Sequence, residues 1–146
     1  MIDSLTISAT GLRAQRLRME VIANNIANAE TTNAGQETVK KDGQDFVKFL
    51  PYRRKSALFA SGPGLSGVKV TGVADIPGEF EKDFRPDHPH ANNIPGDPER
   101  GYLLKPNIQP MLETVDMISA SRAYEANIMA IDALKAMGAS TLRILA

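Results

Sequence analysis

Apolar residues recur at steps of three and four along the first part of the chain, and Arg16 occupies the one polar position of the series. This spacing places the side chains on one stripe of an α-helix. It predicts an amphipathic helix from about Ser4 to Ala29, capped near Asp3 or Ser4. The stripe contains Ile2, Leu5, Ala9, Leu12, Met19, Ala23 and Ile26.

A second helix is predicted at the other end of the chain. Gln109 precedes a proline and is the expected cap, Pro110 suits the first helical position, and Glu113 suits the first turn. No proline follows, and only Gly138 interrupts the helical pattern. Apolar steps of three or four occur among Met111, Val115, Ile118, Ile128, Ile131, Leu134, Met137, Leu142 and Leu145.

The residues between the two helices contain most of the residues that break regular structure. All nine prolines and nine of the eleven glycines lie between positions 35 and 110. β-branched and aromatic residues predict strands within 46–55, 67–75 and 80–84, and the segments 61–67 and 85–101 are expected loops.

The expected fold class is therefore α+β. Long N- and C-terminal α-helices pack as an antiparallel coiled-coil-like hairpin, and a small β-rich middle domain is inserted between them. The expected segments are 1–33 for the N-terminal helix, 34–106 for the β-rich insert with its loops, and 107–146 for the C-terminal helix.

The antiparallel hairpin predicts which charges face each other. Residues pair when their numbers sum to roughly 140, with two or three residues of slack at a rise of about 1.5 Å each. Arg16 then falls opposite Glu125, and Glu20 falls near Arg122. Pairing would offset the cost of burying these charges. The alternative is that both arginines turn to solvent or reach adjacent subunits.

Both helices carry more apolar surface than one mutual seam can cover. Leu17, Val21 and Ile22, for example, lie off the N-terminal stripe. Helices gain most of their stability by packing an apolar face, so an oligomeric helical layer is expected.

Three asparagines, Asn24, Asn25 and Asn28, fall where the first helical pattern fades. In a helical layer their amides could hydrogen-bond across an interface and fix its register. Asparagine also frays and caps helix ends within a single chain. The residues alone leave both interpretations open.

Composition argues against several classes of function. Lys plus Arg and Asp plus Glu both number 17, so no overall field attracts nucleic acid or an anionic membrane. The absence of cysteine excludes disulfides, thiolate metal sites and a cysteine nucleophile. No apolar run is long enough to cross a bilayer. The first residues lack the basic and apolar regions of a cleaved secretory signal.

Three local patterns have simpler explanations than a ligand-binding or catalytic site. His88 and His90, with Asp87 and Asp97 nearby, flank a proline and have no helix to place further ligands, so loop stiffening is favoured over a metal site. The basic cluster at 52–55 is favoured as a solvated strand or subunit contact. The glycine-rich segment 62–67 lacks the lysine and helix of a phosphate loop. No enzyme activity, metal, cofactor or small-molecule substrate is expected.

Motifs at both ends of the chain resemble a known family. "NNIANAETT" and "VDMISASRAYEANIMAIDALKAM" are similar to the paired terminal signatures of bacterial flagellar rod, hook and filament axial proteins. "PYRRK", "HPHANNIPGDPERGYLLKPNIQP" and "ASRAYEAN" narrow the resemblance to proximal rod proteins. The segment 33–50 departs from the family pattern, because "ETVKKDGQDFVKF" has no obvious counterpart there.

The resemblance implies a non-enzymatic structural subunit of the flagellar basal body. It implies export through the flagellar type III apparatus without a cleaved signal, and polymerisation through the terminal helices into the hollow periplasmic rod that transmits torque. The implied partners are the chain itself, other rod proteins, the export apparatus and the basal-body rings, with no nucleic acid. The alternative is a coiled-coil adaptor or export chaperone that binds partner helices.

The terminal motifs also give the expected subunit interface. Small residues in "ASRAYEAN" allow a neighbouring helix to approach closely, with Tyr124 as the large anchor beside them. The residues expected at this interface are Asn24, Asn25, Asn28, Ala120, Arg122, Ala123, Tyr124, Glu125, Asn127 and Ile128.

Overall fold

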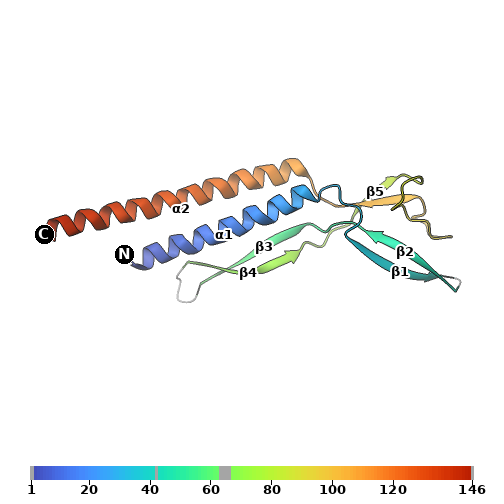
Figure 1. Cartoon of the computed structure of the whole chain (residues 1–146), viewed down its shortest axis with the longest axis horizontal. Helices are drawn as coiled ribbons and strands as arrows, with labels where there is room; N and C mark the ends of the chain where they lie inside the picture. Colours follow the sequence, from blue (N-terminus) through green and yellow to red (C-terminus); the bar gives the residue numbers. More distant parts are fainter. Residues whose placement is uncertain (1, 42, 63–66, 146) are drawn as a thin grey trace. The chain divides into compact units, whose positions relative to one another are not determined.

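Two long helices near the ends of the chain dominate the computed structural model, which describes residues 2–41, 43–62 and 67–145 (Figure 1). Helix α1 spans Ile2–Ala27 and helix α2 spans Pro110–Leu145. Six strands occur between them within the described residues: β1 Gly35–Lys41, β2 Gln44–Leu50, β3 Lys55–Ser61, β4 Val68–Asp75, β5 Glu81–Phe84 and β6 Tyr102–Lys105. Helices flanking a β-rich middle confirm the expected α+β fold class.

The chain divides into two compact units, each built from separated segments of sequence. The helical unit contains α1 as far as Ala23, strands β3 and β4, and α2 from Met111 onward. The strand unit contains Asn24–Arg54 and Asp75–Pro110. The association of β3 and β4 with the helices is not apparent from the linear order of the sequence.

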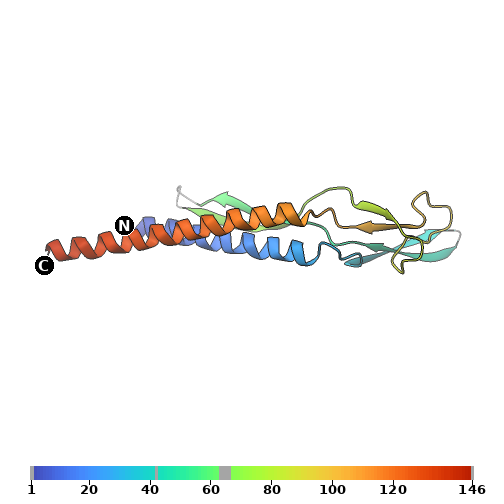
Figure 2. The same cartoon turned by 90° about the horizontal axis from the view of Figure 1, so that it is seen from above.

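Helices α1 and α2 lie side by side and antiparallel in the helical unit (Figures 1 and 2). Gly11 of α1 lies against Asn127 of α2, which agrees with the predicted register. Further along α1, Arg18 Nη2 is 3.4 Å from Asp116 Oδ1. Both side chains of this ion pair are partly exposed, so it stabilises the hairpin by no more than about 1 kcal/mol.

Gly11 permits a close approach between the helices. A Cβ at this position would lie 2.9 Å from Asn127 Oδ1. The Asn127 side chain is held there because its Nδ2 donates to the Ala123 carbonyl at 2.8 Å.

We therefore expect Gly11→Ala and Asn127→Ala to be coupled. Alone, Gly11→Ala gains helix propensity of about 1 kcal/mol but displaces the Asn127 amide. With Asn127→Ala the clash is absent, so the double variant should be more stable than additivity predicts, by about 0.5–3 kcal/mol. Urea unfolding of the four proteins, followed by circular dichroism, measures this coupling. Additive effects would show that Asn127 moves aside freely.

The ends of both helices follow local sequence signals. Helix α2 begins at Pro110, as predicted, and Glu113 in its first turn is buried. Helix α1 begins at Ile2 and ends at Ala27, so the predicted bounds, Ser4 and Ala29, are each two residues late. The loss of regular helix after Ala27 coincides with the asparagine-rich segment.

Strands β3 and β4 pair into a two-stranded sheet, in which Thr71 Oγ1 donates to the Leu58 carbonyl at 3.0 Å. The start of β4 is fixed to α1, because the Val68 amide donates to Thr10 Oγ1 at 3.1 Å. The single strand predicted over 46–55 is wrong in its second half: β2 ends at Leu50, and residues 51–54 are not in a strand. Most of the predicted loop at 61–67 lies outside the described residues.

In the strand unit, β1 and β2 pair antiparallel from Gly35↔Leu50 to Lys41↔Gln44. Most of the segment 33–50 is therefore in two paired strands. Strands β5 and β6 also pair antiparallel, and residues 85–101 between them form turns and irregular structure, which confirms the predicted loop. The buried apolar residues of this unit include Ala91, Ile94, Leu103, Leu104 and Ile108.

Candidate assembly surface

The buried face of α1 is not the apolar stripe identified from the sequence, which runs from Ile2 to Ile26. Ala14, Val21 and Ile22 are buried, and these belong to the opposite side of the helix. Wherever its side chains are described, the apolar stripe identified from the sequence is partly or fully exposed. We call it the outer face of α1 and define it by Leu5, Ala9, Leu12, Arg16, Met19 and Ala23.

Helix α2 has the same division into two faces. Ala120 is fully buried, whereas a row of large apolar side chains is exposed. Met111 is 81% exposed, Ile118 50% and Met129 69%. We call this row the outer face of α2 and define it by Met111, Val115, Ile118, Arg122, Glu125 and Met129, which share one side of the helix because they are spaced by three, four or seven residues.

The charged residues of the two outer faces do not form the ion pairs predicted between the helices. Arg16 Nε is 3.0 Å from Glu20 Oε1 on its own helix, and the Arg16 side chain is 75% exposed. The ion pair observed between the helices is Arg18 with Asp116. Arg122 and Glu125 are exposed, and within the described part of the chain neither has an ion-pair partner. Within a single chain Arg16 and Arg122 therefore turn to solvent, which was the alternative interpretation of the sequence.

The other expected interface residues on α2 differ in burial. Ala120 is covered within a single chain, so its contribution is to the intrachain seam. Ala123, Tyr124 and Asn127 are half-buried, and Ile128 is exposed. Among the small residues of this segment, Ala120 thus packs within the hairpin, and Ala123 remains partly accessible.

The asparagines at the end of α1 act within the strand unit. Asn28 Nδ2 donates to the Asn24 carbonyl at 2.9 Å, and Thr31 Oγ1 donates to Asn28 Oδ1 at 3.1 Å. Asn25 is buried, and its Oδ1 lies 3.5 Å from the Tyr52 hydroxyl. The contacts of Asn28 support the capping interpretation, whereas the contact of Asn25 is with Tyr52 of the strand unit. Asn24 keeps an exposed side chain.

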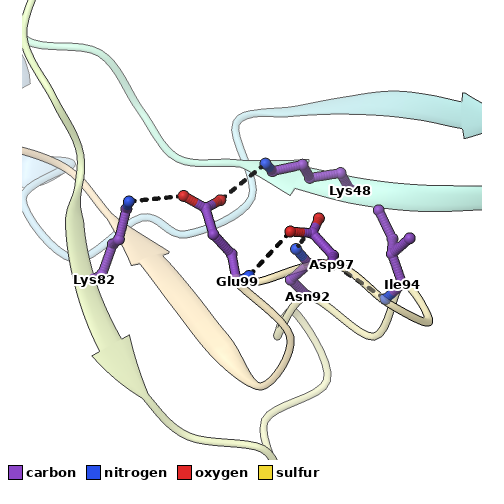
Figure 3. A network of polar contacts seen from close by, with 6 residues as sticks. All are labelled: Lys48, Lys82, Asn92, Ile94, Asp97 and Glu99. Carbon is purple, nitrogen blue, oxygen red and sulfur yellow. Dashed lines mark hydrogen bonds and ion pairs between the residues drawn. The ribbon is translucent and has the colours of Figure 1, made fainter.

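A network of ionic contacts in the strand unit was not predicted from the sequence (Figure 3). Glu99 binds Lys82 at 2.7 Å and Lys48 of β2 at 3.2 Å. Asp97 accepts from the Glu99 amide at 2.9 Å and from Asn92 Nδ2 at 2.8 Å. The network fixes the 85–101 loop against β2. Lys48 and Glu99 are too far apart in sequence for a local pattern to reveal their contact.

These contacts favour the ionised carboxylates. The hydrogen bonds from Lys82 and Lys48 lower the pKa of Glu99. The Glu99 amide and the Asn92 side chain lower the pKa of Asp97. Because folded-state pKa values lie below the unfolded ones, the resulting stabilisation is complete above the ordinary glutamate value, 4.5, and is lost as pH falls through the folded values.

We therefore expect thermal unfolding of the strand unit to occur at lower temperature as the pH falls below about 4.5. Glu99→Gln should weaken this pH dependence, while Glu30→Gln, a change at an exposed carboxyl, should leave it unchanged. Thermal scans monitored by circular dichroism between neutral and acidic pH measure the effect. Equal pH dependence in all three proteins would contradict the assigned role of Glu99.

The histidines and Arg53 of the basic cluster have partners within the strand unit. His90 Nδ1 is 2.9 Å from Thr32 Oγ1, and the His90 amide donates to His88 Nδ1 at 3.1 Å. The Arg53 guanidinium lies 4.6 Å from the centre of the Phe80 ring. Among the described residues, no group of three or more His, Cys, Asp or Glu side chains is arranged to hold a metal ion.

The described helices also include no segment long and apolar enough to span a membrane. The geometry therefore presents two amphipathic helices with a shared seam and two exposed outer faces. These are features of a protein that packs helices against other helices.

Both ends of the sequence match families of flagellar axial proteins. Residues 5–34 match the flagella basal body rod protein family. Residues 99–144 match the C-terminal family of the flagellar basal body rod FlgEFG proteins. The class of protein is thus that of flagellar rod subunits.

Relatives match over nearly the whole chain. The flagellar basal-body rod protein FlgC of Bacillus subtilis is 36% identical over 97% of this chain and 95% of its own length. The FlgC proteins of Aquifex aeolicus and Salmonella typhimurium are 37% and 32% identical, over 92% and 99% of this chain and 90% and 97% of their own lengths. The chain belongs to the FlgC family of flagellar basal-body rod proteins, and its function is that of a structural rod subunit.

Proposed function

We propose that this chain polymerises through its two terminal helices into the rod of the flagellar basal body. The observation that carries the proposal is the row of exposed apolar side chains on α2, together with the partly exposed apolar side chains of the α1 outer face, in a single chain. Exposed apolar side chains gathered on one face of a helix are unfavourable in water and mark a surface that another protein covers. Contacts between unlike faces of identical subunits generate rings or open helical assemblies rather than closed dimers.

In this proposal the expected segments take distinct roles. Residues 1–33 and 107–146 provide the helices of the assembly, and residues 34–106 form the insert. The interface residues are those of the expected set that a neighbour can reach: Asn24, Arg122, Glu125 and Ile128, with the half-buried Asn28, Ala123, Tyr124 and Asn127 at its margin.

The proposed partners are other copies of the chain, other rod proteins, the type III export apparatus and the basal-body rings. The proposed location is the periplasmic rod, reached by export without a cleaved signal. The role is structural rather than catalytic. Membership of the rod-protein family supports these proposals, and the outer faces give the chain the means to bind neighbouring helices.

Complementation of a flagellated strain that lacks its own copy of the gene tests this function. The chain should restore swimming and be recovered in purified basal bodies. A coiled-coil adaptor or export chaperone would instead be recovered as a discrete soluble oligomer and be absent from purified rods. That outcome would contradict the proposal.

A further inference from the structure

The two outer faces have matching spacing. Along the outer face of α1, Leu12, Arg16, Met19 and Ala23 are separated by steps of four, three and four. Along the outer face of α2, read in the reverse direction, the steps from Met129 to Glu125, Arg122 and Ile118 are also four, three and four. Two antiparallel helices could therefore pack along these faces with each residue of one helix opposite one residue of the other. We call each such pair of residues a layer.

The side chains that such layers bring together are complementary. Leu12 meets Met129 and Ala23 meets Ile118, so the two outermost layers are apolar. Between them, Arg16 meets Glu125. In the remaining layer Met19 meets the aliphatic stem of Arg122, which can cover apolar surface while its guanidinium extends to the side.

The charged residues beside the proposed seam favour the same register. Glu20 follows Met19 on α1, so it lies on the side of the layer where the Arg122 guanidinium extends. Arg16 contacts Glu20 within one chain at 3.0 Å, and adding Glu125 and Arg122 gives a cluster of two cations and two anions. In this register each cation is placed beside an anion: Arg16 faces Glu125, and Arg122 lies beside Glu20.

A single chain cannot form this seam. The inner faces of α1 and α2 already contact each other at Gly11 with Asn127 and at Arg18 with Asp116. The outer faces lie on the other sides of the two helices, where Ile118 and Met129 are exposed. The occupant of each outer face must therefore come from another molecule.

We propose that the outer face of α1 in one subunit packs antiparallel against the outer face of α2 in a second copy of this chain, with Arg16 paired to Glu125 of the neighbour. Subunits that point in the same direction present α1 and the neighbour's α2 in opposite directions, as the seam requires. The contact joins unlike faces, so it can repeat from subunit to subunit. This inference rests on the proposed rod function and specifies its partner and register.

Disulfide cross-linking tests the register directly, because the natural chain contains no cysteine. A double variant with Ala23→Cys and Ile118→Cys should give a ladder of covalent multimers when oxidised in purified basal bodies. Each single-cysteine variant should give no ladder. A matched pair, Arg13→Cys with Ile118→Cys, moves one thiol to an exposed position of α1 that is off the outer face, and it should not form the ladder.

A charge exchange between molecules provides the second test. Arg16→Glu alone places two carboxylates opposite each other in the seam, and Glu125→Arg alone places two guanidinium groups opposite each other, so each should reduce swimming strongly. Cells that express both single variants together should recover, because each variant's α1 then meets an opposite charge on the other variant's α2. Arg13→Glu should swim normally.

The outcomes separate this inference from the proposed function. If the wild-type chain is present in rods but the double-cysteine variant gives only monomers, or cross-links only to other rod proteins, the inference fails and the rod function stands. If co-expression of the two charge variants does not restore swimming, the inference is also contradicted. If the wild-type chain is absent from purified rods, both proposals fail.

Discussion

Replacing Ile118 by aspartate is expected to exclude the protein from the rod while leaving its export intact. Ile118 is half exposed in the single chain, so a carboxylate there remains hydrated and changes the stability of the free subunit by only about 0.5 kcal/mol. In the assembled rod the same carboxylate would be buried against an apolar surface. Burying a charge without a partner costs several kcal/mol, roughly a hundredfold or more in the assembly equilibrium.

The measurement compares the amount of the variant in purified basal bodies with the amount exported. Ser119→Asp is the matched control, because Ser119 is exposed on the same turn but lies off the outer face of α2. We expect the control to support swimming and Ile118→Asp to abolish it. Normal rods built from Ile118→Asp would show that this face is not an assembly surface.

Gly67→Ala is expected to release the β3–β4 sheet from α1. Gly67 has φ of +81°, a backbone conformation that costs other residues about 1–3 kcal/mol. An added Cβ would also meet Thr10 Oγ1 and would lie 3.3 Å from the backbone Cα of Ile7. Because a helix backbone cannot move aside as a flexible side chain does, overpacking adds about 1–3 kcal/mol.

The control for this change is Gly43→Ala. Gly43 has a similar φ of +78°, but an added Cβ there meets no atom within 4 Å. Urea unfolding should therefore show a larger loss of stability for Gly67→Ala than for Gly43→Ala. The difference measures the free-energy cost of overpacking against α1. Equal losses would mean that the sheet does not dock on α1 at Gly67.

The helices could be predicted from sequence because their signals are local. Pro110 after Gln109 defines the start of α2, and apolar steps of three and four define both helices. The same pattern did not identify which face of α1 meets α2. Leu12 and Met19 repeat at the same interval as Ala14 and Val21, and periodicity contains no information about which stripe a partner covers.

The remaining errors arise from contacts that are distant in sequence. Strand β1 contains Val39 as its only large apolar residue, and it is stabilised as a strand by its pairing with β2. Glu99 and Lys48 are 51 residues apart, so their contact has no local signature. The predicted pairing of Arg16 with Glu125 within one chain was wrong for the related reason that the hairpin uses the other faces of both helices.

Cryo-electron microscopy of basal bodies purified from complemented cells tests the central claim most directly. We predict that this chain is found in the rod, with the outer faces of α1 and α2 covered by neighbouring subunits and Arg16 within about 4 Å of Glu125 of the adjacent copy. A rod that lacks the chain, or one in which Ile118 and Met129 remain exposed to solvent, would contradict the account.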